Sequence, residues 1–178
     1  SIETEGAGNG GTLIVRAIGS ITVSGINEEK NRSRVEADSE EQATGNGGNI
    51  IVETGSLYIS NSGFISVETK GSGNAGNIDI TAREEVTLAG VSRAGASSRI
   101  AAEVHQSGTG QGGNLSIRAN NLRILDGSRV SVETEGSGNA GTLEVRVADT
   151  VEIAGINTSR ITPSSLEAEV DVYATVNG

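Results

Sequence analysis

Residues 73–80, Gly-Asn-Ala-Gly-Asn-Ile-Asp-Ile, carry the pattern from which the whole chain of 178 residues is built. The first half of this segment is a glycine-rich turn, and related turns recur along the chain. These turns are Gly8-Asn9-Gly10-Gly11, Gly45-Asn46-Gly47-Gly48, Gly73-Asn74-Ala75-Gly76, Gly110-Gln111-Gly112-Gly113 and Gly138-Asn139-Ala140-Gly141. Their first glycines are separated by 37, 28, 37 and 28 residues, so the repeating unit is a 65-residue pair of one long and one short coil. Such a fixed period is typical of solenoid proteins.

Three short segments with alternating apolar residues follow each glycine-rich turn, as expected for strands with one buried face. In the first coil the apolar pairs are Leu13/Val15, Ile21/Val23 and Val35/Ala37, and equivalent pairs follow every later turn. The sequence lacks an apolar period of 3.6 residues bounded by helix caps, so no helix is predicted.

Strands of this length cannot bury an apolar face alone and must stack on the equivalent strands of neighbouring coils. Parallel stacking at roughly 4.8 Å, with the usual right-handed crossover, predicts an all-β, right-handed parallel β-helix, a three-sided β-solenoid. Residues 1–178 are predicted to form one segment of about five coils in alternating long and short pairs. The predicted coils are 8–44, 45–72, 73–109, 110–137 and 138–178. The turn glycines are expected at positive φ, where a Cβ would be strained.

The composition excludes several classes of partner. A net charge of −10 argues against nucleic acid and against anionic membrane surfaces, both of which attract basic proteins. No apolar run approaches the ~20 residues of a membrane span, so no membrane insertion is expected. The chain has no cysteine and therefore neither disulfides nor a thiolate metal site. Because it begins without Met, within the repeat pattern, it is expected to be part of a longer repetitive protein.

One outward position of the third segments is acidic in every coil. We name this set the acidic column, and it consists of Glu3, Asp38, Glu68, Glu103, Glu133 and Glu169. Like charges stacked one strand spacing apart repel one another. The column is therefore either a cation-binding strip, with calcium as the natural ligand, or a solvated face that keeps the molecule soluble. The solvated face is the favoured interpretation, and no cofactor is predicted.

A second column lies in the glycine-rich turns and carries amide side chains. Its members are Asn9, Asn46, Asn74, Gln111 and Asn139. Stacked amides form hydrogen bonds along the axis of other cross-β stacks, so this column is predicted to stabilise the fold.

The long coils carry insertions at Gly25–Arg34, Gly90–Arg99 and Gly155–Ser165. These loops are expected on one side of the molecule, roughly 10 Å apart, because two strand spacings separate them. Loops on a rigid scaffold often bind partners, and a partner or glycan contact is one interpretation. Their sequences differ, which argues against a repeated ligand site and leaves tolerated insertions as the alternative.

No catalytic residues are predicted, and the chain is not expected to be an enzyme. His105 is the sole histidine, and it aligns with Lys70 and Glu135 at an outward position, as expected for a solvated residue. The sequence contains no Ser/His/Asp set, zinc spacing or phosphate loop. Because β-helices also host polysaccharide lyases and hydrolases, a carbohydrate-active enzyme is kept as an alternative. It would need a localised cleft and acids such as Glu103 or Glu133.

The pattern Gly-Asn-Ala-Gly-(Asn/Thr)-(Ile/Leu)-x-(Ile/Val) at 73–80 and 138–145 resembles repeats of large exoproteins related to filamentous haemagglutinin. The segment Asn-Leu-Arg-Ile-Leu-Asp-Gly-Ser-Arg-Val-Ser-Val at 121–132 is also similar to them. The nearest resemblance is to very long cyanobacterial members, and it covers essentially the whole chain.

This resemblance implies a β-helical shaft that is exported by two-partner secretion through an outer-membrane transporter. The expected location is extracellular or at the cell surface, and the expected role is structural and adhesive. The implied partners are a cell-surface, extracellular-matrix or glycan component. The alternative is a filament or sheath subunit that assembles end to end with copies of itself.

Overall fold

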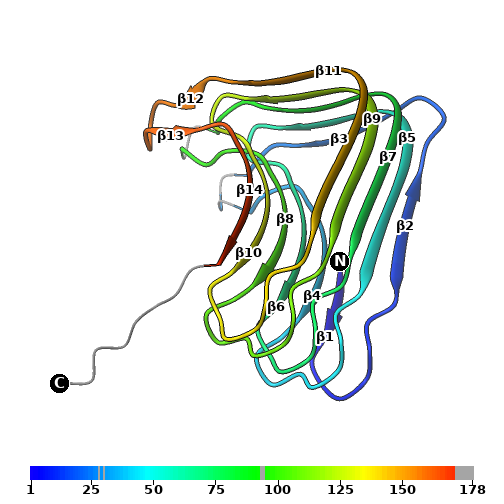
Figure 1. Cartoon of the computed structure of the whole chain (residues 1–178), viewed down its shortest axis with the longest axis vertical. Coiled ribbons are helices and arrows are strands. Elements are labelled where there is room, and N and C mark those ends of the chain that lie inside the picture. The colour runs from blue at the N-terminus through cyan, green and yellow to red at the C-terminus, as the bar shows by residue number, and fades with distance from the viewer. Residues whose placement is uncertain (28, 30, 93–94, 171–178) are drawn as a thin grey trace.

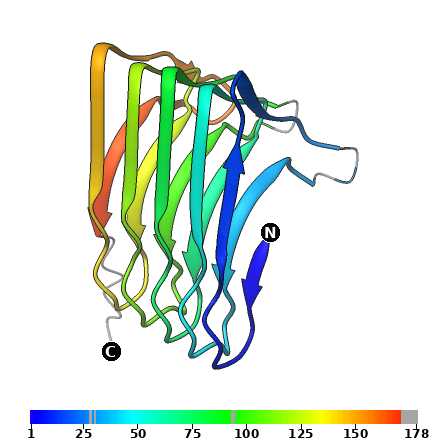
Figure 2. The same ribbon diagram turned by 90° about the vertical axis from the view of Figure 1, so that its right-hand side faces the viewer.

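The computed structural model describes residues 1–27, 29, 31–92 and 95–170, and this part of the chain contains strands but no helix. The strands stack into a right-handed parallel β-solenoid whose coils advance along one axis (Figures 1 and 2). The fold predicted from the sequence is therefore confirmed. The strands are β1 (Ile2–Thr4), β2 (Thr12–Arg16), β3 (Ser20–Ser24), β4 (Arg34–Ser39), β5 (Asn49–Ser60), β6 (Phe64–Thr69), β7 (Ile78–Ala89), β8 (Arg99–Val104), β9 (Leu115–Leu125), β10 (Arg129–Thr134), β11 (Leu143–Ala154), β12 (Ile156–Asn157), β13 (Thr162–Pro163) and β14 (Ser165–Val170).

Two parallel sheets form the walls of the solenoid. Sheet A has the order β1-β4-β6-β8-β10-β14 and contains the third segments of the coils. Sheet B has the order β11-β9-β7-β5-β2, with β3 also paired to β5, and it bends to cover the other two sides (Figure 1). The register of every pair matches the sequence alignment, as in Val35↔Ile65 and Ile65↔Ile100.

The first and second segments were expected as separate strands, but in the later coils they form one bent strand. In β5 the bend lies at Gly55, where the register shifts between Thr54 and Ser56. A Cβ on Gly55 would overlap the carbonyl oxygen of Gly19 in the neighbouring coil. The irregularity lets the strand turn a corner without leaving the ladder, as β-bulges do.

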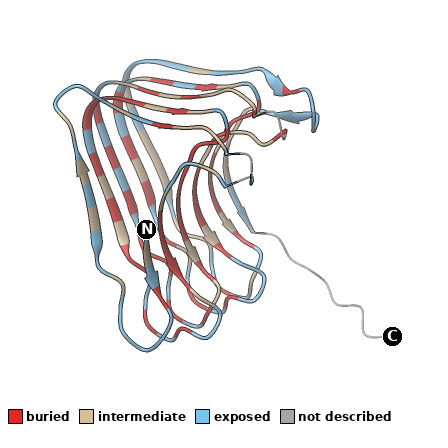
Figure 3. Cartoon of the chain, turned by 180° about the vertical axis from the view of Figure 1, so that it is seen from behind, coloured by how far each residue is buried: buried red, intermediate tan, exposed pale blue. Residues whose placement is uncertain are grey.

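The core is a set of aliphatic stacks that run parallel to the axis. Ile50, Ile78 and Leu115 occupy one stack and are 0% exposed. Buried residues alternate with more exposed ones along β7 and β9, and along β5 outside its bend, where residues 54–57 are all buried (Figure 3). Each fully buried side chain of this size contributes about 1.5–3 kcal/mol through the hydrophobic effect, so the stacks hold neighbouring coils together.

The glycine-rich turns depend on close packing of the backbone rather than on positive φ. A Cβ on Gly76 would overlap the carbonyl of Gly48, and one on Gly73 would overlap the carbonyl of Gly45. The glycines with positive φ in the described part lie elsewhere, at Gly25, Gly90, Gly95, Gly127 and Gly155. The expectation of positive φ in the turns was therefore wrong.

Candidate functional site on the outer face of sheet A

The outer face of sheet A is concave, because its strands bow toward the interior of the solenoid (Figure 1). We call this concave surface the outer groove. Residues at alternate positions of each strand face it, and they form three columns that continue from coil to coil. In β4 the members of the three columns are Arg34, Glu36 and Asp38. The third of them is the acidic column predicted from the sequence.

The register places every member of the acidic column next to its neighbour in the following coil, as predicted. Its burial differs from the expectation of a solvated face. The carboxylate side chains of Glu68, Glu103 and Glu133 are only 18%, 15% and 14% exposed. Only the end members Glu3 and Glu169 are exposed. The middle of the column therefore requires compensation for burying charge.

Arginines of the first column provide part of this compensation. Arg99 contacts Glu103 at 2.8 Å, and Arg129 contacts Glu133 at 3.1 Å, each within one strand. Arg129 also lies 3.8 Å from Glu103 in the neighbouring strand. These side chains extend across the middle column, where Ala101 is 0% exposed although it faces outward. The sequence analysis missed this compensation, but the signal was present as an arginine four residues before the acid in both strands.

At the other edge of the groove a lysine pairs with two acids. Lys70 Nζ lies 3.2 Å from Glu40 and 3.9 Å from Glu68. The groove is therefore a network of ion pairs rather than an open anionic strip. Within the described residues, no group of three or more His, Cys, Asp or Glu side chains has the geometry to hold a metal ion.

Asp38 is the member of the acidic column whose negative charge is most strongly destabilised by its surroundings. Its side chain is 7% exposed, and its Oδ1 accepts no hydrogen bond from any described residue. Burial, followed by repulsion from Glu36 and Glu68, raises the pKa of Asp38 to about 7, while Lys70 opposes the rise. Burial also raises the pKa of Glu68. Asp38 therefore exchanges its proton near neutral pH.

The loops of the long coils lie on one side of the molecule, as predicted, but they also contact one another. Arg32 Nη2 of the first loop donates to the carbonyl of Ser97 in the second loop at 2.8 Å. Asn157 Nδ2 of the third loop donates to Gly95 O at 2.9 Å and to Ser97 Oγ at 2.8 Å. The described residues of the three loops are thus joined by hydrogen bonds into one ridge beside the groove, and their different sequences are parts of a single surface.

His105 lies in the groove beside the acidic column and is exposed, as predicted. Its Nδ1 is 3.1 Å from Ser107 Oγ, whose hydroxyl donates to the carbonyl of Lys70. Neighbouring side chains line a cavity of about 110 Å³ that includes Glu103 and Glu133. Both of these acids, which the enzyme alternative requires, face arginines.

The predicted amide column is present, and its first four amide oxygens, those of Asn9, Asn46, Asn74 and Gln111, each accept a backbone hydrogen bond from the next coil. Asn9 Oδ1 accepts from Asn46 N at 2.9 Å, and Asn46 Oδ1 accepts from Asn74 N at the same distance. A second ladder, missed from the sequence, runs through Asn49, Asn77 and Asn114 to Thr142. Both ladders fasten adjacent coils outside the core.

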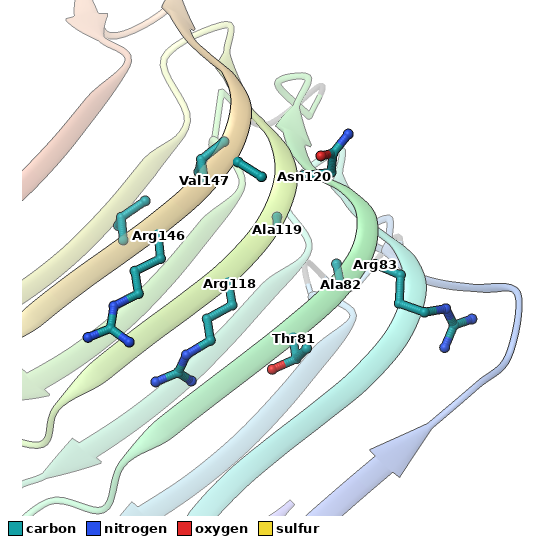
Figure 4. Close-up of a pocket in the computed structure, with 10 residues that line it drawn as sticks. Thr81, Ala82, Arg83, Arg118, Ala119, Asn120, Arg146 and Val147 are labelled. Carbon is teal, nitrogen blue, oxygen red and sulfur yellow. The ribbon is translucent and has the colours of Figure 1, made fainter.

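A second cavity lies on the outer side of sheet B, at the bend of β7, β9 and β11 (Figure 4). It measures about 640 Å³ and is bordered by Arg83, Arg118 and Arg146. The guanidinium of Arg118 lies 3.6 Å from Glu144, and that of Arg146 lies 2.7 Å from the same residue. These charges are compensated on an open surface, so the outer groove of sheet A is the stronger candidate site.

The fold defines the chain as a β-solenoid. No protein-family model, curated protein or solved structure matches it. The resemblance to haemagglutinin-like repeats therefore stays a prediction. The described residues include no helix that is both long and apolar enough to span a membrane.

Proposed function

We propose that this chain is a length of rigid shaft in a secreted surface exoprotein, with a structural and adhesive role. The observation that carries the proposal is the parallel pairing of every coil with the next in both sheets, which continues on either side of the bends in sheet B. Export through an outer-membrane transporter and a location at the cell surface follow from the sequence resemblance. The proposed role is non-enzymatic.

Three kinds of contact between neighbouring coils make the shaft rigid. The parallel ladders join the backbones, the aliphatic stacks bury the side chains, and the amide ladders connect the glycine-rich turns. A solenoid in which each repeat contacts only its neighbours behaves as a one-dimensional stack. Such a stack can hold a binding surface at a distance from the cell.

The proposed contact surface is the outer groove together with the ridge of long loops. Its charges occupy fixed places, because Arg99, Arg129 and Lys70 are paired with acids of the column. Fixed charges favour recognition of a polar partner, since little side-chain freedom is lost on binding. A glycan or a matrix component is the partner that suits this surface.

End-to-end assembly of copies is a second candidate, favoured by exposed apolar residues of the last coil. Val151 and Ile153 occupy core positions in the repeat but are 50% and 43% exposed. Their strand, β11, is an edge strand, which offers unpaired backbone groups to a further coil. Light scattering that shows polymers growing with protein concentration would favour this candidate, whereas a monomer at all concentrations would exclude it.

The experiment for the shaft proposal is immunogold electron microscopy of intact cells of the source organism, with antibody raised against this chain. Labelled fibres or a labelled outer coat are expected. Permeabilised cells and pre-immune serum are the controls. Label that appears only after permeabilisation would refute the surface role, and the enzyme alternative would then be tested on polysaccharides.

A further inference from the structure

Four arginines converge where the ridge of long loops meets the outer groove. They are Arg32, Arg99, Arg129 and Arg160, and they line a cavity of about 350 Å³ that we call the arginine pocket. The whole chain contains 13 lysine and arginine residues and has a net charge of −10. Nearly a third of its cations therefore gather at one place on an acidic molecule.

The coils bring these residues together from distant parts of the sequence. Arg32, Arg99 and Arg160 come from the three long loops in turn, and Arg129 begins strand β10. Because the loops are fastened to one another, the pocket exists as a single composite site rather than a repeated one. This arrangement could not be read from any one repeat.

Two of the guanidinium groups are held in place by the protein. Arg32 Nε donates to Ser62 O at 2.6 Å, and its Nη2 donates to Ser97 O. The guanidinium carbons of Arg32 and Arg99 lie 4.6 and 5.4 Å from the ring centre of Phe64, which is the chain's only phenylalanine. Such cation–π contacts orient both groups before any ligand arrives.

The positive charge of the pocket is only partly compensated. Arg99 and Arg129 pair with acids of the groove, and Glu167 at the rim lies 3.6 Å from Arg129. In the described part of the chain, Arg32 and Arg160 have no carboxylate within ion-pair distance. Burial, with repulsion from Arg99 and Arg160, lowers the pKa of Arg32 to about 10.

Hydroxyl groups add further hydrogen-bond donors to the pocket. The hydroxyl-bearing residues Ser97, Thr162 and Ser165 line the same cavity. Guanidinium groups match the oxygen geometry of sulfate and phosphate and bind them through paired hydrogen bonds. A partly compensated arginine cluster with hydroxyl donors beside it is complementary to an anion.

We propose that the arginine pocket binds a tetrahedral oxyanion, sulfate or phosphate, either free or as an ester on a larger molecule. The cavity is at the small end of the range for ligand pockets, which suits one ester group with the sugar that carries it. This inference goes beyond the shaft proposal, because the pocket would bind an oxyanion wherever the protein is located.

The test is isothermal titration calorimetry of the whole chain with sodium sulfate and sodium phosphate, at constant ionic strength. Sodium acetate and sodium chloride are the control salts. Saturable binding of either tetrahedral ion is expected, with weaker binding of acetate. Equal heats from all four salts, or no saturable binding, would overturn the proposal.

The informative variant is Arg160→Gln, because Arg160 is exposed and its side chain has no hydrogen bond among the described residues. Losing one charged donor should weaken binding by roughly tenfold or more. Arg123→Gln removes the same charge from an exposed position on sheet B, where Arg123 pairs with Glu152 at 2.8 Å. Circular dichroism verifies that both variants are folded. Equal affinities of the two variants would refute the assignment of the site.

Two polymers distinguish the source of the anion. Dextran sulfate that binds more tightly than free sulfate, while neutral dextran does not bind, supports an esterified glycan as the ligand. Free ions that bind while dextran sulfate does not support a small-molecule ligand. Binding of both dextrans to the wild type and to Arg160→Gln alike would contradict an oxyanion site.

Discussion

The buried carboxyl group of Asp38 should make the stability of the solenoid depend on pH in an unusual direction. Its pKa is about 7 in the folded chain, against ~3.9 for an unperturbed aspartate. The folded state therefore holds this proton more tightly than the unfolded state does. The contribution of Asp38 to stability is highest below pH ~4, falls as the pH rises toward 7, and is constant above that.

The size of the effect follows from the difference between the two pKa values. About three pH decades at 1.36 kcal/mol each set an upper limit of ~4 kcal/mol. Solvent screening of the repulsion from Glu36 and Glu68 reduces this value, so we expect about 1–3 kcal/mol. Asp38→Asn keeps the shape of the side chain and removes its titration. The variant should be more stable than the wild type at pH 8 by this amount and equal to it or less stable at pH 4.

Urea unfolding followed by circular dichroism, at intervals between pH 4 and 8, measures this difference. Subtracting one protein from the other cancels the titrating groups that lie far from Asp38, so the remaining difference belongs to Asp38 and the charges coupled to it, Glu68 and Lys70. Glu3→Gln is the matched control, because Glu3 is an exposed member of the same acidic column, and its difference from the wild type should be small throughout. A difference for Asp38→Asn that is constant with pH would refute the reasoning.

Three further predictions concern the core, the turns and cations. Ile117→Ala should lower the free energy of unfolding by about 2–5 kcal/mol, because the Ile117 side chain is 0% exposed in an inner coil. A denaturant titration measures this loss, and Ile14→Ala, at a position that is 46% exposed, should lose much less. Gly76→Ala should destabilise by on the order of 1–3 kcal/mol, because its Cβ would overlap the Gly48 carbonyl. Gly19→Ala, with open space around its Cβ position, is the control, and equal midpoints of thermal unfolding for the two would contradict this reason. Calcium should not raise the midpoint of thermal unfolding beyond an equal ionic strength of sodium chloride, since arginines and a lysine already face the acidic column. A rise specific to calcium would restore the cation-strip interpretation.

The repeat predicted the fold and the register because one strict spacing governs both. Once the third segments are aligned, Glu68, Glu103 and Glu133 must stack, and the structure places them so. The alternation of apolar residues likewise predicted which side chains fill the core. The fold, the register and the core residues all follow from aligning residues that occupy equivalent positions in successive coils.

Other features of the structure depend on contacts that the spacing of the sequence repeat does not predict. The burial of the acidic column results from the bow of sheet A and from arginines that extend across Ala101. The need for glycine in the turns results from backbone packing between coils, which a single repeat does not reveal. The arginine pocket combines Arg32 and Arg160, which occupy different positions in loops of different sequence. Alignment of repeats cannot find a site whose members are not equivalent.

The outer groove, the amide ladders and the arginine pocket can form only if residues 65 positions apart in the sequence lie two strand spacings apart in the fold. The chain has no cysteine, so nitroxide labels can be attached to introduced cysteines without background. Thr22, Thr87 and Glu152 occupy one outward column of sheet B. Electron paramagnetic resonance of Thr22→Cys/Thr87→Cys and Thr22→Cys/Glu152→Cys should give distances near 10 and 19 Å, before allowance for the label arms. Two narrow distributions that increase in this way would support the solenoid and every site built on it. Broad distributions, or a second distance no longer than the first, would contradict it.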